Sequence, residues 1–237
     1  MGVLKGRKIL VMGGSRGIGA AIVRRLAADG GRVTFTYAGS KDAADALASE
    51  TGSTALQADS VSRDAVIAAV RAVSPVDILV ISAGVFVYAD IREGEADVID
   101  RMIDLNVRAP YHASAEAAKT MPDGGRIIII GSVNADAVPV TGASGYAMTK
   151  AAMQGLARGM ARDLGPKGIT VNVVQPGPVA TDMNPEHGDF ADALRSFMAI
   201  PRYARPEEIA GMVAYLAGPE AGIVTGAMHT IDGGFAC

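Results

Sequence analysis

The feature that most constrains the fold is a set of short apolar segments that alternate with helical patterns. The segment Val76–Ile81 ends in four consecutive apolar residues, and Ile127–Ile130 is apolar at every position. A strand with one face in water alternates apolar and polar residues, whereas an uninterrupted apolar strand is buried on both faces. The alternation of such strands with helices therefore predicts a parallel sheet that is covered by helices on both sides.

Seven β-type segments and six helical segments can be placed along the chain. The strands are expected at Arg7–Met12, Arg32–Tyr37, Thr54–Ala58, Val76–Ile81, Gly125–Gly131, Ile169–Gln175 and Ala227–Ile231. The helices are expected at residues 20–28, 41–49, 63–73, 96–121, 144–164 and 206–216, and Pro110 should bend or split the fourth. No linker, repeat or low-complexity tract interrupts the 237 residues. We therefore expect an α/β chain with a doubly wound, seven-stranded parallel sheet in a single domain.

A glycine-rich turn follows the first strand and precedes the first helix. It reads Gly13-Gly14-Ser15-Arg16-Gly17-Ile18-Gly19. Glycines let the backbone turn tightly and approach a ligand, and the positive end of the helix dipole then faces a pyrophosphate. The spacing differs from the commonest dinucleotide fingerprint, but its place is that of the phosphate turn in a Rossmann-type fold. The residues expected to bind a dinucleotide cofactor here are Gly13, Ser15, Arg16, Gly17, Ile18 and Gly19.

The end of the second strand bears on which cofactor is bound. Many NAD-binding folds carry an acidic residue there that binds the ribose hydroxyls, whereas this chain has Tyr37, followed by Ser40 and Lys41. No carboxylate repels a 2′-phosphate, and Arg16, Ser40 and Lys41 could bind one. This pattern favours NADP(H) over NAD(H). The alternative that Arg16 and Lys41 are ordinary solvated charges stays open for either residue alone.

A candidate acid–base pair lies at the start of the helix expected at residues 144–164. Tyr146 and Lys150 are four residues apart and therefore share one helix face. A nearby ammonium favours the phenolate, so we expect Lys150 to lower the pKa of Tyr146 and make it a useful acid or base. Ser132 follows the apolar run 127–130, and its hydroxyl could hold a carbonyl oxygen that accepts the Tyr146 proton. Because Tyr-x-x-x-Lys also occurs by chance on exposed helices, its value depends on its surroundings.

Several candidate ligands follow the ends of predicted strands. These are the glycine turn, Asp59, Ala83-Gly84, Ser132 and Pro176-Gly177. Ligands of an open parallel sheet bind beyond the carboxyl ends of its strands, so these residues should form one rim. Asn106 lies within an otherwise apolar stretch, where its amide is either a satisfied core group or part of the site.

Composition excludes several other functions. Lys and Arg total 22 and Asp and Glu total 25, a net charge of −3 without a basic stripe, which argues against sequence-independent nucleic-acid binding. One cysteine and three scattered histidines give no metal-binding pattern, and no apolar run reaches the length of a membrane span. The first residues lead into a strand and do not read as a signal peptide, so we expect a cytoplasmic protein.

Residues 182–200 differ in composition from the strands and helices around them, and we expect them to form a mobile lid over a pocket.

Taken together, these motifs resemble the short-chain dehydrogenase/reductase family, and in particular its 3-oxoacyl-acyl-carrier-protein reductases. The matches cover almost the whole chain and comprise Gly13-x-x-x-Gly17-Ile18-Gly19, Asp59, Ala83-Gly84, Asn106, Ser132, Tyr146-x-x-x-Lys150, Asn172-x-x-x-Pro176-Gly177, Thr181, Thr225-Gly226 and Asp232-Gly233-Gly234. The chain departs from the family pattern at three places. Met12 stands where a threonine is usual, Ile81-Ser82 stands where Asn-Asn is usual before Ala-Gly, and one additional residue lies between Ser132 and Tyr146. The resemblance implies reduction of a ketone or aldehyde by hydride transfer from an NAD(P) cofactor.

The resemblance also implies roles for individual residues. Tyr146 would be the acid or base, Lys150 its electrostatic partner and a ribose ligand, Ser132 the group that orients the carbonyl, and Asn106 the holder of a relay water. Asp59 and Ala83 would lie near the adenosine, and Val179 and Thr181 near the nicotinamide amide. The substrate pocket would be shaped by Phe86, Val87, Asn134, Val140 and Met183. The family further implies a homotetramer, in which the helices 96–121 and 144–164 form a four-helix interface.

A narrower resemblance suggests a second class of function. Gly131-Ser-Val-Asn, Ala109-Pro-Tyr-His-Ala-Ser and Val174-Gln-Pro-Gly-Pro look like a branch of the family described as cyclic di-GMP-binding mediators of biofilm dispersal. The alternative hypothesis is therefore a binder of cyclic di-GMP on this scaffold, and a third is a structural relative with an unused site. We rank the enzyme first because a complete set of Asn106, Ser132, Tyr146 and Lys150 is hard to explain without hydride transfer.

Overall fold

The computed structural model describes residues 2–237 and contains one seven-stranded sheet. Its strands are β1 (Lys8–Met12), β2 (Arg32–Tyr37), β3 (Thr54–Gln57), β4 (Ile78–Ile81), β5 (Arg126–Ile130), β6 (Thr170–Pro176) and β7 (Met228–Ile231). All pairs are parallel, in the spatial order β3-β2-β1-β4-β5-β6-β7. The predicted doubly wound sheet is confirmed, and the strand order reverses between β1 and β4, where such sheets bind ligands.

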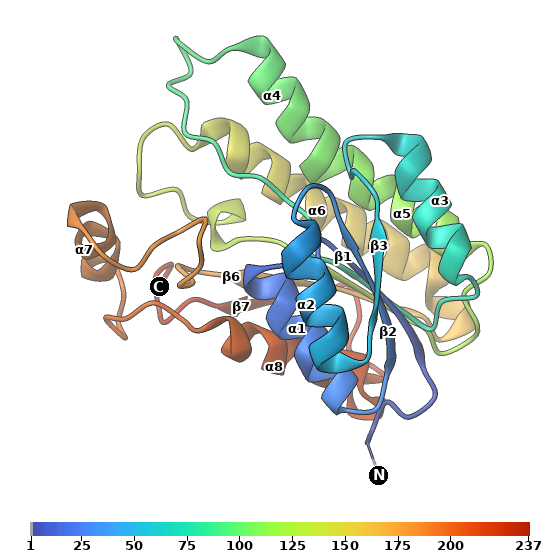
Figure 1. Cartoon of the computed structure of the whole chain (residues 1–237). Coiled ribbons are helices and arrows are strands. Elements are labelled where there is room, and N and C mark those ends of the chain that lie inside the picture. Colours follow the sequence, from blue (N-terminus) through green and yellow to red (C-terminus); the bar gives the residue numbers. More distant parts are fainter. Residues whose placement is uncertain (1) are drawn as a thin grey trace.

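Helices cover both faces of the sheet (Figure 1). One face packs against α1 (Gly17–Ala28), α2 (Lys41–Thr51) and α8 (Pro206–Ala217). The other face packs against α3 (Arg63–Val73), α5 (Ala109–Ala118) and α6 (Ser144–Leu164). Strands β4 and β5 lie at the centre of the sheet and are buried along their whole length, which explains why they are apolar at nearly every position.

The predicted helix at residues 96–121 is interrupted before Pro110 rather than at it. It consists of α4 (Ala96–Ile103), a π-helical turn (Asp104–Arg108) and α5, whose first turn contains Pro110. Proline is tolerated in the first turn of a helix, and the wider turn before it accommodates the missing backbone donor. Asn106 lies inside this π-helical turn, and such turns are frequent at functional sites.

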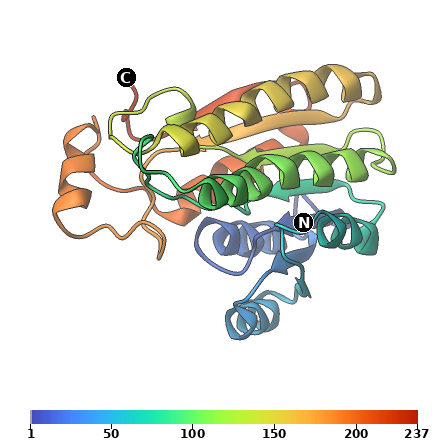
Figure 2. The same cartoon turned by 90° about the horizontal axis from the view of Figure 1, so that it is seen from above.

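The segment predicted to be a lid contains a short helix, α7 (Asp189–Ser196), set apart from the sheet beyond the carboxyl ends of the strands (Figures 1 and 2). Its apolar side chains pack into a small separate core with Val133, Tyr203 and Phe235. The remaining short elements are three single 3₁₀ turns, at residues 133–135, 165–167 and 219–221. Within residues 2–237, no helix has both the length and the apolar character needed to cross a bilayer.

Candidate functional site

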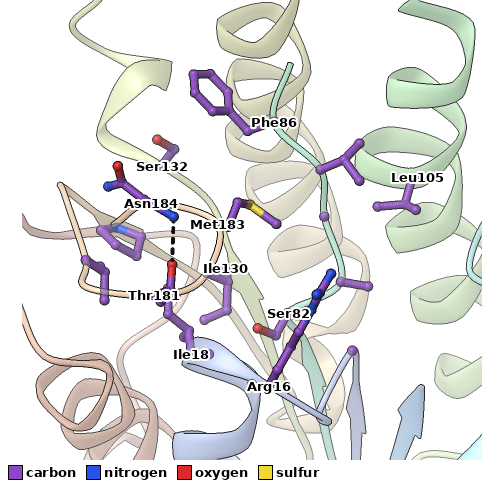
Figure 3. A pocket seen from close by; sticks show the side chains of 18 of the residues that line it. Arg16, Ile18, Ser82, Phe86, Leu105, Ile130, Ser132, Thr181, Met183 and Asn184 are labelled. Atoms are coloured by element: carbon purple, nitrogen blue, oxygen red, sulfur yellow. Dashed lines mark hydrogen bonds between the residues drawn. The ribbon is translucent and has the colours of Figure 1, made fainter. Parts of the chain in front are cut away.

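A cleft with a volume of about 460 Å³ runs along the carboxyl ends of the strands. It passes from the glycine turn after β1 to the start of α6 and to the lid segment. Figure 3 shows Arg16 and Ser82 at one end of the view and Phe86 and Ser132 at the other. The predicted site residues that line it are Gly13, Ser15, Arg16, Gly17, Ile18, Gly19, Tyr37, Ser40, Asp59, Ala83, Gly84, Phe86, Ser132, Asn134, Val140, Tyr146, Lys150, Pro176, Gly177, Val179, Thr181 and Met183.

Two glycines of the turn, Gly13 and Gly19, are packed too closely for side chains. A Cβ atom on Gly19 would lie 2.0 Å from the carbonyl oxygen of Gly13, and one on Gly13 would lie 2.7 Å from the backbone of Ala83. Gly13 also has a φ of +74°, which favours glycine. The backbone N–H of Gly13 donates to Thr36 Oγ1 at 3.0 Å and so ties the turn to β2. The turn therefore presents uncovered backbone at these glycines, at the start of α1.

Only two of the three polar side chains that were predicted to bind a 2′-phosphate line the cleft. Arg16 precedes α1 and Ser40 precedes α2, and both line the cleft. Lys41 does not line it, because its ammonium points along α2 to the carboxylate of Asp45 at 2.5 Å. The structure thus brings Arg16 and Ser40 together with Tyr37, and it leaves Lys41 on the solvated face of its helix.

At the other end, Ser132, Tyr146 and Lys150 converge. Ser132 follows β5, and its Oγ accepts a hydrogen bond from the backbone N–H of Asn134 at 3.1 Å. The ammonium of Lys150 lies 5.6 Å from the centre of the Tyr146 ring and donates to the carbonyl oxygen of Ile130 at 3.0 Å. Lys150 is only 7% exposed and contacts no carboxylate among the described residues.

Burial controls the protonation of both titratable groups. It raises the pKa of Tyr146 to about 12, and hydrogen bonding with Ser132 opposes this only in part. It lowers the pKa of Lys150 to about 8. Contrary to the expectation of a lowered pKa, the Tyr146 phenol therefore has a raised pKa, because it is buried away from water. The phenol is therefore protonated at neutral pH, and its raised pKa means that it gives up the proton only to a strong acceptor, such as a carbonyl oxygen that gains negative charge.

Comparisons with known proteins agree with this geometry. The family model described as enoyl-(acyl carrier protein) reductase matches residues 13–236. The chain belongs to the short-chain dehydrogenase/reductase family. The cyclic-di-GMP-binding biofilm dispersal mediator protein of Escherichia coli is 62% identical over 235 residues, which are 99% of each chain.

A solved structure and a reductase of lower identity are also similar to this chain. The crystal structure of BdcA in complex with NADPH is 61% identical, with a TM-score of 0.98 over 100% of this chain and 97% of that one. The 3-oxoacyl-acyl-carrier-protein reductase MabA of Mycobacterium tuberculosis is 34% identical over 96% of this chain and 92% of MabA. Both resemblances stated from the sequence, to the reductases and to the biofilm dispersal branch, are thus confirmed, and the chain is an oxidoreductase of this family.

In this short-chain dehydrogenase/reductase, Asn106 lies beneath the cleft rather than in its wall. It is 2% exposed, and its Oδ1 accepts from the backbone N–H of Val85 at 2.9 Å. Its Nδ2 donates to the carbonyl oxygen of Val85 at 2.9 Å and to Thr149 Oγ1 at 3.1 Å. The side-chain amide is paired, as expected of a satisfied core group, and it does not line the cleft. The role of Asn106 as the holder of a relay water stays a prediction.

A ring of polar side chains near Ser132 was missed by the sequence reasoning. Gln154 donates to Asp136 Oδ1 at 2.7 Å and to Gln175 Oε1 at 2.8 Å, and Gln175 donates to Asp136 Oδ2. The ring joins the loop after Ser132, helix α6 and strand β6. Gln154 lies four residues, or one helical turn, after Lys150 and therefore on the same face of the helix, and this spacing could have indicated that Gln154 is near the site. Elsewhere in residues 2–237, no group of three His, Cys, Asp or Glu side chains could hold a metal ion.

Proposed function

We propose that the protein reduces a ketone or aldehyde to an alcohol with NADPH. The observation that carries this proposal is that one cleft joins the uncovered backbone of the glycine turn at its first end to Ser132, Tyr146 and Lys150 at its other end. The first end suits a pyrophosphate, and the second end suits a carbonyl group that gains negative charge. The relatives, which include a structure with NADPH and a 3-oxoacyl-acyl-carrier-protein reductase, support the same reaction class.

The residues of the first end fit NADPH better than NADH. Arg16 is exposed at the start of α1, Ser40 lines the same part of the cleft, and the end of β2 carries Tyr37 instead of a carboxylate. A guanidinium is well suited to a phosphate because it donates several hydrogen bonds in one plane. We assign Asp59, Ala83 and Gly84 to the adenosine side and Pro176, Gly177, Val179 and Thr181 to the nicotinamide side.

When bound, the cofactor supplies the hydride for the carbonyl carbon. Ser132 and Tyr146 hold the carbonyl oxygen by donating hydrogen bonds, which strengthen as negative charge develops on that oxygen. Tyr146 then transfers its proton to the oxygen, and one carbonyl compound becomes one alcohol. The ammonium of Lys150 stabilises the phenolate that remains, because it lies beside the Tyr146 ring. Asn106 keeps the loop after β4 and helix α6 in register during this transfer.

The test is the variant Tyr146→Phe, which removes only the hydroxyl. We expect NADPH binding, measured by calorimetry, to change little, and turnover of any accepted carbonyl compound to fall by about 10²- to 10⁴-fold. The matched control is Tyr111→Phe, since Tyr111 is exposed on α5 and does not line the cleft. Wild-type turnover by Tyr146→Phe would show that the proposed proton donor is wrong.

A second candidate function is favoured by one observation, the 62% identity to a protein named as a cyclic-di-GMP-binding mediator of biofilm dispersal. Cyclic di-GMP carries two phosphates, and the glycine turn with Arg16 is a site of matching chemistry. Calorimetry with cyclic di-GMP, with and without saturating NADPH, tests it. Tight binding together with no reduction of any carbonyl compound in a broad panel would replace the enzyme by the binder.

We also propose a homotetramer. Helix α6 exposes a strip of small residues, and a Cβ atom on Gly155 or Gly159 would meet no atom within 4 Å, so a partner helix can approach closely. Light scattering at micromolar concentration tests this, and a monomer would contradict it. We place the protein in the cytoplasm, where its single cysteine, Cys237, stays reduced.

A further inference from the structure

The substrate end of the cleft has an aromatic wall, which we define as Phe86, Tyr88 and Phe190. The Phe86 ring lies edge-on to the Tyr146 ring, with 4.5 Å between their centres. Tyr88 continues the row at 4.2 Å from Phe86, and Phe190 follows at 5.6 Å from Tyr88. The row starts at the proton donor, crosses the loop after β4 and ends on lid helix α7.

The outer part of the aromatic wall is unusually exposed for such large rings. Tyr88 is 43% exposed and Phe190 is 47% exposed, although both line the cleft. Met183 faces the same cleft from the lid segment and is 55% exposed. Exposed apolar side chains that gather around a concave site indicate an apolar ligand.

The charges around the cleft narrow the class of ligand. Its lining contains three basic side chains, Arg16, Arg101 and Lys150, and none belongs to the loop after β4 or to the lid. Asp182, beside Met183, adds a negative charge on the lid side. A carboxylate or phosphate on the substrate would therefore meet no cation at the aromatic wall and would be repelled by Asp182.

The distance from the aromatic wall to the catalytic groups narrows the class of ligand further. Because the Phe86 ring is in van der Waals reach of the Tyr146 ring, a carbonyl group held by Tyr146 and Ser132 lies directly beside the aromatic wall. A ring bonded to the carbonyl carbon would reach the wall without a spacer. Aromatic rings pack favourably edge-to-face at centre distances of about 4.5–7 Å, and the contacts of Phe86 with Tyr146 and of Tyr88 with Phe190 fall in this range.

We propose that the substrate is a neutral aromatic ketone or aldehyde whose ring packs against the aromatic wall. This inference rests on the proposed reductase function. The carbonyl carbon gains the cofactor's hydride, the oxygen gains the Tyr146 proton, and the products are a benzylic-type alcohol and the oxidised cofactor. Phe86 and Tyr88 bind one side of the ring, and Phe190 covers it from the lid.

The experiment uses the full chain with NADPH and three matched ketones. Acetophenone is the probe, cyclohexyl methyl ketone replaces its ring by a saturated one, and 4-acetylbenzoate adds a carboxylate to the ring. We expect kcat/KM for acetophenone to exceed that for cyclohexyl methyl ketone by about 2- to 10-fold, the range for an aromatic pair. We expect 4-acetylbenzoate, whose carboxylate lies on the ring, to be reduced at least about 10-fold more slowly than acetophenone.

Variants then test whether the preference for the aromatic ketone comes from the aromatic wall. Phe190→Leu should bring the ratio of kcat/KM for acetophenone to kcat/KM for cyclohexyl methyl ketone close to one while the saturated ketone is still reduced. Tyr88→Phe should keep this ratio. The matched control is Phe197→Leu, because Phe197 is 46% exposed at the end of α7 but packs on Phe235 and does not line the cleft.

Two outcomes overturn the inference. In the first, the saturated or the anionic ketone is preferred, or Phe190→Leu leaves the ratio unchanged; the protein is then a reductase of another substrate class. In the second, NADPH binds but no ketone in the panel or in a broader set of carbonyl compounds is reduced. The proposed function then fails together with this inference.

Discussion

Lys150 gives the structure a pH-dependent stability that can be measured without a substrate. Burial lowers its pKa from 10.5 to about 8 in the folded chain. Between these values the unfolded chain binds more protons than the folded chain, so the stability contributed by this group rises with pH and is lowest below pH 8. At 1.36 kcal/mol for each pKa unit, the buried ammonium costs about 3 kcal/mol at neutral pH.

The perturbation is Lys150→Met, which replaces the side chain by an unbranched one that is one atom shorter and has no charge. We expect the free energy of unfolding of the wild type, minus that of the variant, to rise by about 3 kcal/mol between pH 7 and pH 10.5. The hydrogen bond to the Ile130 carbonyl contributes little to this change, because a neutral amine can also donate it. For a chain of this size the change corresponds to a relative shift in Tm of about 6–12 °C.

Urea unfolding of both proteins without cofactor, at several pH values across this window, measures the difference. The matched control is Lys167→Met, because the Lys167 side chain is exposed in the folded chain. Its difference from the wild type should stay flat with pH. If the difference for Lys150→Met also stays constant within about 0.5 kcal/mol, the ordinary error of such comparisons, then burial does not control the charge of Lys150.

Three further predictions follow from other parts of the site. Arg16→Ala should weaken NADPH binding by about 10- to 100-fold and leave NADH binding unchanged, whereas Lys41→Ala should affect neither in calorimetry. Gly19→Ala should destabilise the chain by about 1–3 kcal/mol and lower its Tm, whereas Gly39→Ala, with open space around its Cβ, should not. Asp136→Ala should cost about 1–3 kcal/mol, because the buried Gln175 amide then keeps only a long hydrogen bond of 3.5 Å to Thr230 Oγ1. It should also lower kcat more than it changes the NADPH Kd, and an unchanged kcat would show that the ring does not position Ser132.

The sequence predicts the strands, the glycine turn and the helix that carry this site, because each of them depends on a local pattern of residues. Apolar runs identify the two central strands, and the glycines of the first turn mark a place where the backbone must pass without side chains. Tyr146 and Lys150 share a helix face because they are four residues apart, and the structure keeps them together. These inferences need only the period of a helix or a strand and the steric limits of glycine.

The sequence could not predict what depends on contacts between distant segments. The pKa of Tyr146 is raised mainly because distant parts of the chain, with Phe86 against its ring, bury it away from water, and no spacing along the sequence reports that. The aromatic wall joins residues about a hundred positions apart. Lys41 is a different case, because Asp45 lies four residues further along the same helix and its competition for the ammonium could have been read from the sequence.

Asn106 shows how one buried amide links the two halves of the substrate end. Its bonds to both backbone groups of Val85 fix the residue before Phe86, where the aromatic wall begins. Its bond to Thr149 fixes a hydroxyl that in turn donates to the carbonyl oxygen of Tyr146 at 2.8 Å. The π-helical turn is the local distortion that carries this amide between the loop and α6. A regular helix would present residue 106 at a different angle, so the irregularity is the feature that holds the aromatic wall and the proton donor in one arrangement.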